Sequence, residues 1–169
     1  VDDSDITVTL DHGPLRGDFK ADVRTVERIG FERFGSGISY NWVVDMRTGM
    51  VAVGQPLDAK GTHTVNDKRI PGFDEDLNRH GYAVALMQNV DDEVTDAQVQ
   101  LVAATFAAAE LEGHVKRGAP IYPHRKFAWK SCPGDKAVAR LDEIQRLKDE
   151  MVRTGNLNPN QEDDMADAA

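Results

Sequence analysis

Residues 82–87 constrain the fold of this chain more than any other stretch. They read YAVALM, six residues without the polar alternation of a strand that has one face in water. A continuous apolar strand of this length is typical of the interior of a sheet, where both faces are covered. The sequence therefore predicts a central strand at 82–87, with other strands beside it and helices packed on the sheet.

Other segments have the β-branched or aromatic composition of strands. Residues 6–10 form the first of them. Residues 40–44 and 50–53 are separated by a short turn, which predicts a hairpin. Residues 121–122 have room only for a short strand, which we expect at an edge of the sheet.

Three segments have the apolar spacing of helices that cover a sheet. They run from Asp18 or Asp22 to Phe34, from Thr95 to a stop at Gly113, and from Asp135 or Lys136 to Met151. Thr95 and Gln98 form a capping box, which satisfies free amides at the start of a helix. Because strands alternate with helices, we expect an α/β domain over residues 1–153, a central mixed sheet flanked by helices, and a polar acidic linker or tail over 154–169.

The charge of the chain disfavours a nucleic-acid partner. The net charge is −9, and seven carboxylates at the two ends account for most of it, so the body carries only −2. There is no basic stripe to follow a phosphate backbone. No apolar run approaches the ~20 residues of a membrane span, so we expect no membrane insertion, and we also expect no signal peptide. A single cysteine excludes an internal disulfide and fits a reducing compartment.

The strongest chemical signal lies between His124 and Gly134. This loop contains the only cysteine, Cys132, with His124 eight positions before it and Lys130 two positions before it. Imidazole and thiolate are good zinc ligands, and zinc requires four donors. A further histidine and a water would complete a catalytic site, whereas a structural site needs a fourth protein ligand. The alternative is that Cys132 is a small buried apolar residue. Asp135 is placed to cap the next helix.

Four other histidines differ in their surroundings. His12 follows the strand at 6–10 and precedes Gly13-Pro14, so it is either held at a loop mouth, where ligands usually lie, or exposed in a turn. His63 lies in the long irregular stretch from residue 55 to 76, and such stretches inside a compact domain are often functional. His80 and His114 adjoin loop glycines and are expected at the surface.

Three separated pieces of the chain together resemble the type 2 N-acetylmuramoyl-L-alanine amidases. These zinc amidases share a fold with peptidoglycan recognition proteins and small amidase lysozymes of phages. The pieces are the strand that ends in His12, the hairpin that begins GISYNWVV at residue 37, and the motif His124-x5-Lys130-x-Cys132-Pro133-Gly134. The likeness covers roughly residues 6–150, and residues 61–63 and 81–87 resemble the family's loop and central strand. The family usually has a threonine where this chain has Gly13-Pro14.

The resemblance implies a zinc ion held by His12, His124 and Cys132, with water in the fourth position. It implies hydrolysis of peptidoglycan at the amide between the lactyl group of N-acetylmuramic acid and L-alanine. Lys130 would stabilise the oxyanion, although it could be a solvated loop lysine. Tyr40 would orient the water by a hydrogen bond, although it could simply pack beside Trp42.

Two further residues are candidates for substrate binding. His63 either lines the substrate groove or is an ordinary loop histidine. Trp129 either stacks on a sugar ring or packs beneath the loop that contains Cys132. We expect both residues to belong to the substrate site.

The main alternative is a non-catalytic peptidoglycan-binding module of the same fold. Such modules lack the zinc thiolate, whereas this chain has Cys132. The resemblance favours the catalytic domain of a phage endolysin, monomeric, with a cell-wall-binding domain possible outside the fragment. It would be made in the host cytoplasm and act on the cell wall after release. A bacterial autolysin and a recycling amidase are the other settings.

Overall fold

The computed structural model describes residues 6–8, 18–56, 59–63 and 77–158. Its sheet has five strands in the order β3-β2-β4-β1-β5. They are β1 (Ile6–Val8), β2 (Trp42–Asp45), β3 (Val51–Val53), β4 (Tyr82–Met87) and β5 (Ile121–Pro123). β3 is antiparallel to β2, and the other neighbours are parallel, so the sheet is mixed as predicted. β4 lies at the centre with all six residues buried, which confirms its predicted place.

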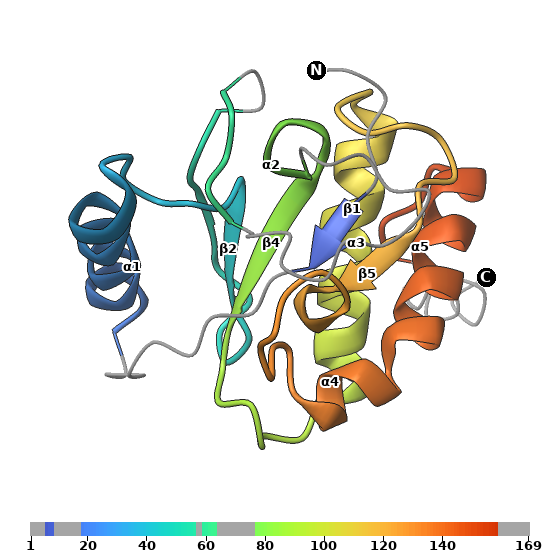
Figure 1. The fold of residues 1–169 in the computed structure, drawn as a ribbon. Helices are drawn as coiled ribbons and strands as arrows, with labels where there is room; N and C mark the ends of the chain where they lie inside the picture. Colours follow the sequence, from blue (N-terminus) through green and yellow to red (C-terminus); the bar gives the residue numbers. More distant parts are fainter. Residues whose placement is uncertain (1–5, 9–17, 57–58, 64–76, 159–169) are drawn as a thin grey trace.

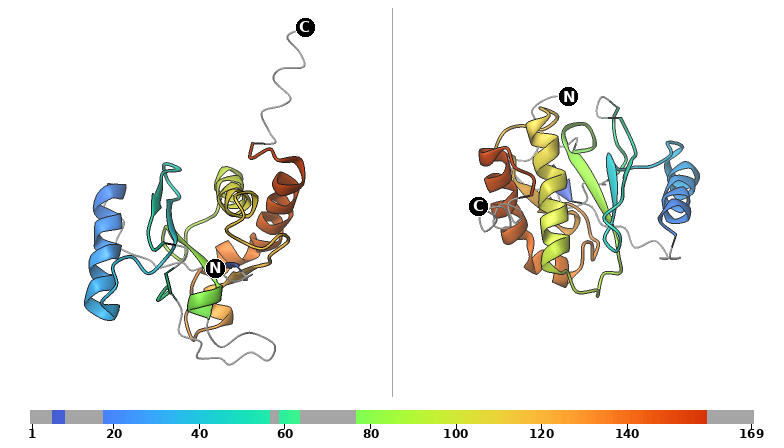
Figure 2. Two further views of the ribbon diagram at one scale, coloured as in Figure 1. Left: turned by 90° about the horizontal axis from the view of Figure 1, so that it is seen from above. Right: turned by 180° about the vertical axis from the view of Figure 1, so that it is seen from behind.

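Helices cover both faces of this sheet (Figures 1 and 2). α1 (Phe19–Phe34) lies on one face, and α3 (Asp96–Leu111) and α5 (Leu141–Thr154) lie on the other. The short helices α2 (Leu77–His80) and α4 (Asp135–Ala139) precede β4 and α5. No helix in the described ranges is long and apolar enough to cross a membrane.

The side chains of β4 explain the two layers. Tyr82, Val84 and Leu86 pack into a core cluster with residues of α3 and α5. The alternate residues Ala83, Ala85 and Met87 join a smaller cluster with Phe19 and Val26 of α1. Successive side chains of a strand point to opposite faces, so one apolar strand supplies both cores.

The predicted helix boundaries are largely confirmed. Asp18 caps α1 and accepts a hydrogen bond from the Lys20 amide at 3.0 Å, and Gly35 ends the helix in the left-handed conformation. In the capping box of α3, the Thr95 amide donates to Gln98 Oε1 at 2.8 Å and the Gln98 amide donates to Thr95 Oγ1 at 3.3 Å. Gly113 lies just past α3 with a φ of 76°, as expected of a stop.

The helix predicted from residue 135 or 136 to Met151 is wrong in one respect, because it is two helices. α4 and α5 are separated at Arg140, whose guanidinium bonds to the Val94 carbonyl at 2.8 Å and to Asp96 at 2.7 Å. These contacts fix the bend against the start of α3. Asp135 is the first helical residue instead of the cap, which is Gly134, and α5 continues to Thr154.

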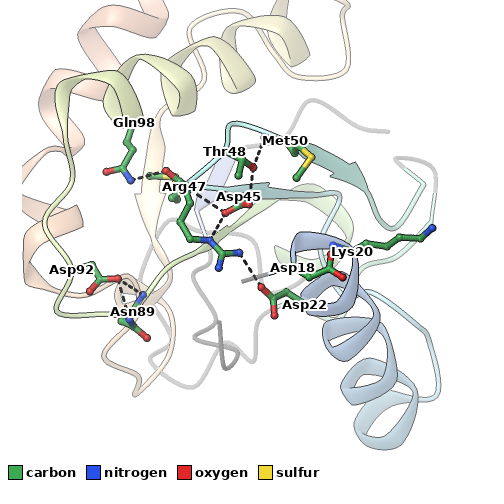
Figure 3. Close-up of polar contacts among 11 residues, drawn as sticks. Asp18, Lys20, Asp22, Asp45, Arg47, Thr48, Met50, Asn89, Asp92 and Gln98 are labelled. Carbon is green, nitrogen blue, oxygen red and sulfur yellow. Dashed lines mark hydrogen bonds and ion pairs between the residues drawn. The ribbon is translucent and has the colours of Figure 1, made fainter. Parts of the chain in front are cut away.

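A charged network, which the sequence did not indicate, ties α1 to the end of β2 (Figure 3). Arg47 bonds to Asp45 at 2.9 Å and to Asp22 of α1 at 3.0 Å, and both carboxylates are buried. Burial raises the pKa of Asp45, but hydrogen bonds from Arg47 and Thr48 outweigh it and hold that pKa below its usual value. The α1 layer is therefore attached by ion pairs as well as by apolar contacts.

Candidate metal and substrate site

Backbone hydrogen bonds fold the loop after β5 back on itself. His124 opens a 3-10 turn, and its carbonyl accepts the amide of Phe127 at 3.0 Å. The Arg125 amide then donates to the Cys132 carbonyl at 2.9 Å, across the loop. This bond brings the segments that carry His124 and Cys132 together, and both side chains are buried. In Figure 1 this loop is the orange segment between β5 and α4.

The donor chemistry of the loop fits zinc. Cys132 is a free thiol, and the neutral imidazole of His124 with a thiolate is a donor pair that zinc accepts. Within the described ranges, no three His, Cys, Asp or Glu residues are grouped so that they could hold a metal. A third ligand would have to come from outside those ranges, where the predicted ligand His12 lies.

The sheet register limits how far His12 can be from this loop. Val8 of β1 pairs with Pro123 of β5, the residue immediately before His124. His12 follows Val8 by four residues, which span at most about 14 Å of extended chain. Parallel strands end at the same edge of a sheet, so the chain can deliver His12 to the His124 loop.

His63 is the other histidine that the structure brings to this region. It is buried, and burial followed by the charge of nearby His124 lowers its pKa to about 4, while the Leu77 backbone opposes the shift. His63 is therefore neutral near pH 7 and can exchange hydrogen bonds without carrying charge. It does not form a three-residue metal group with His124 and Cys132.

A chain of hydroxyl groups connects the His63 segment to the Tyr40 segment. Thr62 Oγ1 bonds to Ser39 Oγ at 2.8 Å, and Ser36 Oγ lies 3.2 Å from the same Thr62 oxygen. Thr62 precedes His63 and Ser39 precedes Tyr40, so this hydrogen bond joins the segments that carry the two candidate residues. The sequence analysis missed these three hydroxyls, because residues 23 and 26 positions apart leave no local pattern.

Tyr40 is buried on the α1 side of the sheet, in the cluster that contains Ala83 and Ala85. Its carbonyl accepts the Gln55 amide at 2.8 Å. A Cβ at Gly54 would lie 2.2 Å from the same oxygen, so only glycine allows this approach. The carbonyl of Tyr40 is thus held by the 54–55 segment, and packing beside the sheet accounts for part of the burial of its side chain.

The remaining two candidates, Lys130 and Trp129, lie on the outer side of the loop. Both are exposed, and the Lys130 amide donates to the Ala128 carbonyl at 2.9 Å. Trp129 is 75% exposed, so the alternative that it packs beneath the loop is wrong, and its predicted place in the substrate site stays a prediction. Phe127 and Ala128 fill that place instead, and both are fully buried.

Asn41 fixes where β2 meets β4, next to Tyr40. The backbone amide of Asn41 donates to the Ala83 carbonyl at 2.9 Å, and the side-chain oxygen Oδ1 of Asn41 accepts the Ala83 backbone amide at 2.9 Å. The side chain therefore takes the place of a backbone carbonyl and extends the ladder beyond the strand. This explains why β2 begins at Trp42, two residues later than predicted.

Solved structures with the same fold come from animals and bacteria. Peptidoglycan recognition protein LB of Drosophila is 16% identical with a TM-score of 0.66, covering 84% of this chain and 79% of that one. Bumblebee PGRP-SA is 13% identical with a TM-score of 0.65, covering 80% and 78%. An endolysin N-acetylmuramoyl-L-alanine amidase from Clostridium intestinale is 20% identical with a TM-score of 0.62, covering 85% and 82%. These likenesses confirm the predicted fold.

The sequence comparison gives the family. A comparison with curated proteins gives no significant match. The model of the N-acetylmuramoyl-L-alanine amidase family matches residues 11–135, about three quarters of the chain. The matched range begins at the residue before His12 and includes Tyr40, His124 and Cys132. This chain therefore belongs to the N-acetylmuramoyl-L-alanine amidase family.

Proposed function

We propose that this protein is a zinc-dependent peptidoglycan amidase. It would hydrolyse the amide between the lactyl group of N-acetylmuramic acid and L-alanine of the stem peptide. The observation that carries this proposal is the closed loop of residues 124–134, in which an imidazole and the only thiol of the chain are both buried and a backbone hydrogen bond joins the segments that carry them. Family membership agrees with it.

His124, Cys132 and His12 are the residues that would hold the ion. Bound zinc supplies a Lewis acid and lowers the pKa of its water toward neutrality. The chain supplies the remaining parts of the chemistry. The Arg125–Cys132 backbone bond holds together the segments that carry the two loop ligands, which reduces the ordering of the backbone that metal binding would require.

Lys130 is the candidate for stabilising the negative charge that develops on the scissile carbonyl oxygen. Its side chain is exposed, two residues before Cys132 in the loop. One donor to an oxyanion contributes about 3–4 kcal/mol to lowering the barrier. Tyr40 would donate or accept a hydrogen bond to orient the attacking water. Neutral His63 would bind polar groups of the substrate beside His124.

Peptidoglycan binding without hydrolysis is the second candidate. Recognition proteins with this fold are among the similar structures. Cys132 favours hydrolysis, because a binding module has no use for a zinc thiolate. An endolysin role, with action on the cell wall after release from a host cell, is part of the proposal and agrees with the name of one similar structure.

The test is an assay of purified protein on soluble muropeptides. We expect new L-alanine amino groups to appear, to stop appearing with a chelator, and to return with added zinc. Cys132→Ala should abolish the reaction, while the variant at the exposed neighbour, Ser131→Ala, should retain it. Retention of peptidoglycan with no bond cleaved under any metal condition would favour the binding module.

A further inference from the structure

Gln88 has a buried side-chain amide that the described part of the fold does not satisfy. The residue directly follows β4, and only 5% of it is exposed. Neither Nε2 nor Oε1 has a hydrogen-bond partner among the described residues. A buried amide without a partner costs free energy, and an apolar side chain of similar size would avoid that cost. Packing alone therefore does not explain a glutamine at this position.

Gln88 lies at the edge of the sheet where the proposed metal loop begins. β4 and β5 are both parallel to β1, so the three strands end at the same edge. β4 continues into Gln88 there, and β5 continues into His124. The backbone amide of Gln88 donates to the Leu86 carbonyl at 3.1 Å, which turns the chain as the strand ends. The unsatisfied side chain is thus at the same end of the sheet as the loop of residues 124–134.

The turn after Gln88 packs directly against the segment that carries Cys132. A Cβ at Gly134 would lie 2.1 Å from the Val90 carbonyl oxygen, so the two backbones are in contact and only glycine fits. Val90 follows Gln88 by two residues, and Gly134 follows Cys132 by two. Cys132 and Leu86 also belong to the same core cluster. The buried amide and the only thiol of the chain therefore lie on adjoining segments.

Further contacts anchor this turn beside the loop. The backbone amide and the side chain of Asn89 both donate to the Asp92 carboxylate, at 3.0 and 3.1 Å (Figure 3). The next residue but one in the sequence after Asp91, Glu93, forms an ion pair with Lys136 of α4, the helix that follows the loop. Gln88 is therefore carried by a backbone that is held in place on both sides of the contact.

The burial of Gln88 limits what its amide can bind. A substrate in the groove is a poor partner, because both polar atoms of the side chain are buried. A zinc-bound thiolate is a good partner, since its sulfur keeps negative charge and accepts N–H hydrogen bonds. Groups that surround metal ligands and bond to them fix the orientation of those ligands. The adjoining Cys132 is the residue that would supply such a sulfur.

We propose that Gln88 is a positioning residue of the metal centre, whose side-chain Nε2–H donates to Cys132 Sγ in the zinc-bound protein. A thiol sulfur is only a weak acceptor. When the metal binds, the thiol proton is released to solvent and the sulfur becomes a strong acceptor. The bond from Gln88 would then hold the thiolate in the orientation that the ion requires. This inference rests on the zinc site of the proposed function and assigns Gln88 to metal binding rather than to hydrolysis.

Zinc affinity and the stability of the metal-free protein test this role together. Gln88→Leu should raise the zinc Kd about tenfold to a hundredfold, measured by competition with a chromophoric chelator. The same variant should raise the urea midpoint of the metal-free protein, because an unsatisfied buried amide is removed. The matched control is the neighbour Asn89→Ala, which loses two satisfied hydrogen bonds. It should lower the urea midpoint and leave zinc affinity unchanged.

Cobalt substitution gives a readout that a purely structural role would not affect. Cobalt bound to a thiolate absorbs through charge transfer from sulfur to metal, and a hydrogen bond to the sulfur lowers the energy of its electrons. Gln88→Leu should therefore shift this band to longer wavelength, whereas Asn89→Ala should leave it in place. If Gln88→Leu fails to fold, Gln88→Met, which keeps the length of the side chain, is expected to give the same shift.

The outcomes separate this inference from the proposed function. A Gln88→Leu protein with wild-type zinc affinity and an unshifted cobalt band would overturn the inference and leave the amidase standing. A lower urea midpoint with unchanged zinc affinity would also overturn it, since the amide would then have a structural partner such as a buried water. Weaker zinc binding with a shifted band, in a protein that cleaves no muropeptide, would support the inference and overturn the amidase. A wild-type protein that binds neither metal would overturn both.

Discussion

Two buried polar clusters of this molecule differ in how their groups are satisfied. Lys148 and Glu110, between α5 and α3, form an ion pair at 2.6 Å, and both are almost completely buried. Lys148 also bonds to the Ala119 carbonyl at 2.9 Å, and Glu110 accepts the Gly118 amide at 2.6 Å. His63 and His124 are also buried, but burial and the charge of His124 lower the pKa of His63.

This difference distinguishes a structural cluster from a candidate functional one. Paired buried charges with additional hydrogen bonds hold helices and loops in place. A buried group whose pKa is shifted by desolvation and a like neighbour is typical of sites where chemistry occurs. We therefore expect changes in the first cluster to affect stability alone, and changes in the second to affect activity.

The largest expected effect is on stability, from Glu110→Ala. This variant removes the buried carboxylate that pairs with Lys148 and leaves its ammonium with only the half-exposed Asp149 carboxylate, at 2.9 Å, as an ion-pair partner, which costs about 3–5 kcal/mol of unfolding free energy. Urea unfolding measures the loss. The matched double variant, Glu110→Ala with Lys148→Met, should recover most of it. The kcat of the folded fraction should remain that of the wild type, and a specific loss of kcat would break the distinction.

The second effect is a loss of stability in acid that arises from His63. Its folded-state pKa is about 4, below the ordinary value of 6.5, so protons bind the unfolded chain first. The contribution of neutral His63 to the free energy of unfolding is complete above pH 6.5. It falls by about 3 kcal/mol as the pH decreases to 4. Urea unfolding of metal-free protein across this range measures the slope.

The control for this pH dependence is a histidine outside the site. His63→Gln should flatten the slope between pH 4 and 6.5, whereas His114→Gln, at a partly exposed position, should leave it as in the wild type. An unchanged slope in His63→Gln would show that another group is responsible.

A third and smaller effect concerns the activity of His63→Ala. If neutral His63 binds polar groups of the substrate, the loss of its hydrogen bond should reduce kcat/KM by about tenfold to a hundredfold, or 1–3 kcal/mol. Stability at pH 7 should change less than in Glu110→Ala. Full activity in this variant would place His63 with the structural residues.

The smallest effect comes from the hydroxyl chain. Thr62→Val removes the bond to Ser39 and should cost about 1 kcal/mol of stability with a drop in kcat, because the His63 segment loses its attachment beside Tyr40. Thr95→Ala, in the capping box of α3, should cost a similar stability and leave kcat unchanged. If both variants lower kcat equally, the hydroxyl chain has no positioning role.

What the sequence could predict was local. The apolar run of β4 and the Thr95–Gln98 capping box depend on neighbouring residues, and both are as predicted. Lys148 could not be predicted in this way. A lysine can be buried on the inward face of α5 only because it pairs with Glu110, which lies 38 residues away in the sequence. Arg140 divides a helix for the same reason, since its contacts are with the start of α3.

The features of the candidate site also fall into those that a local motif predicts and those that only the folded chain brings together. His124, Cys132 and Lys130 could be proposed from the sequence because they lie in one motif. The proximity of His63 to His124 and the Ser39–Thr62 bond depend on the folded chain. The exposure of Trp129 could not be predicted either, because an aromatic residue in a loop is compatible with packing or with display.

The most direct test of the central proposal is the zinc content of purified protein. We predict one zinc per chain in the wild type and in His63→Ala, and close to none in Cys132→Ala and His12→Ala. A full zinc content in Cys132→Ala, or its loss in His63→Ala with retention in His12→Ala, would contradict the assignment of His12, His124 and Cys132 as the metal ligands.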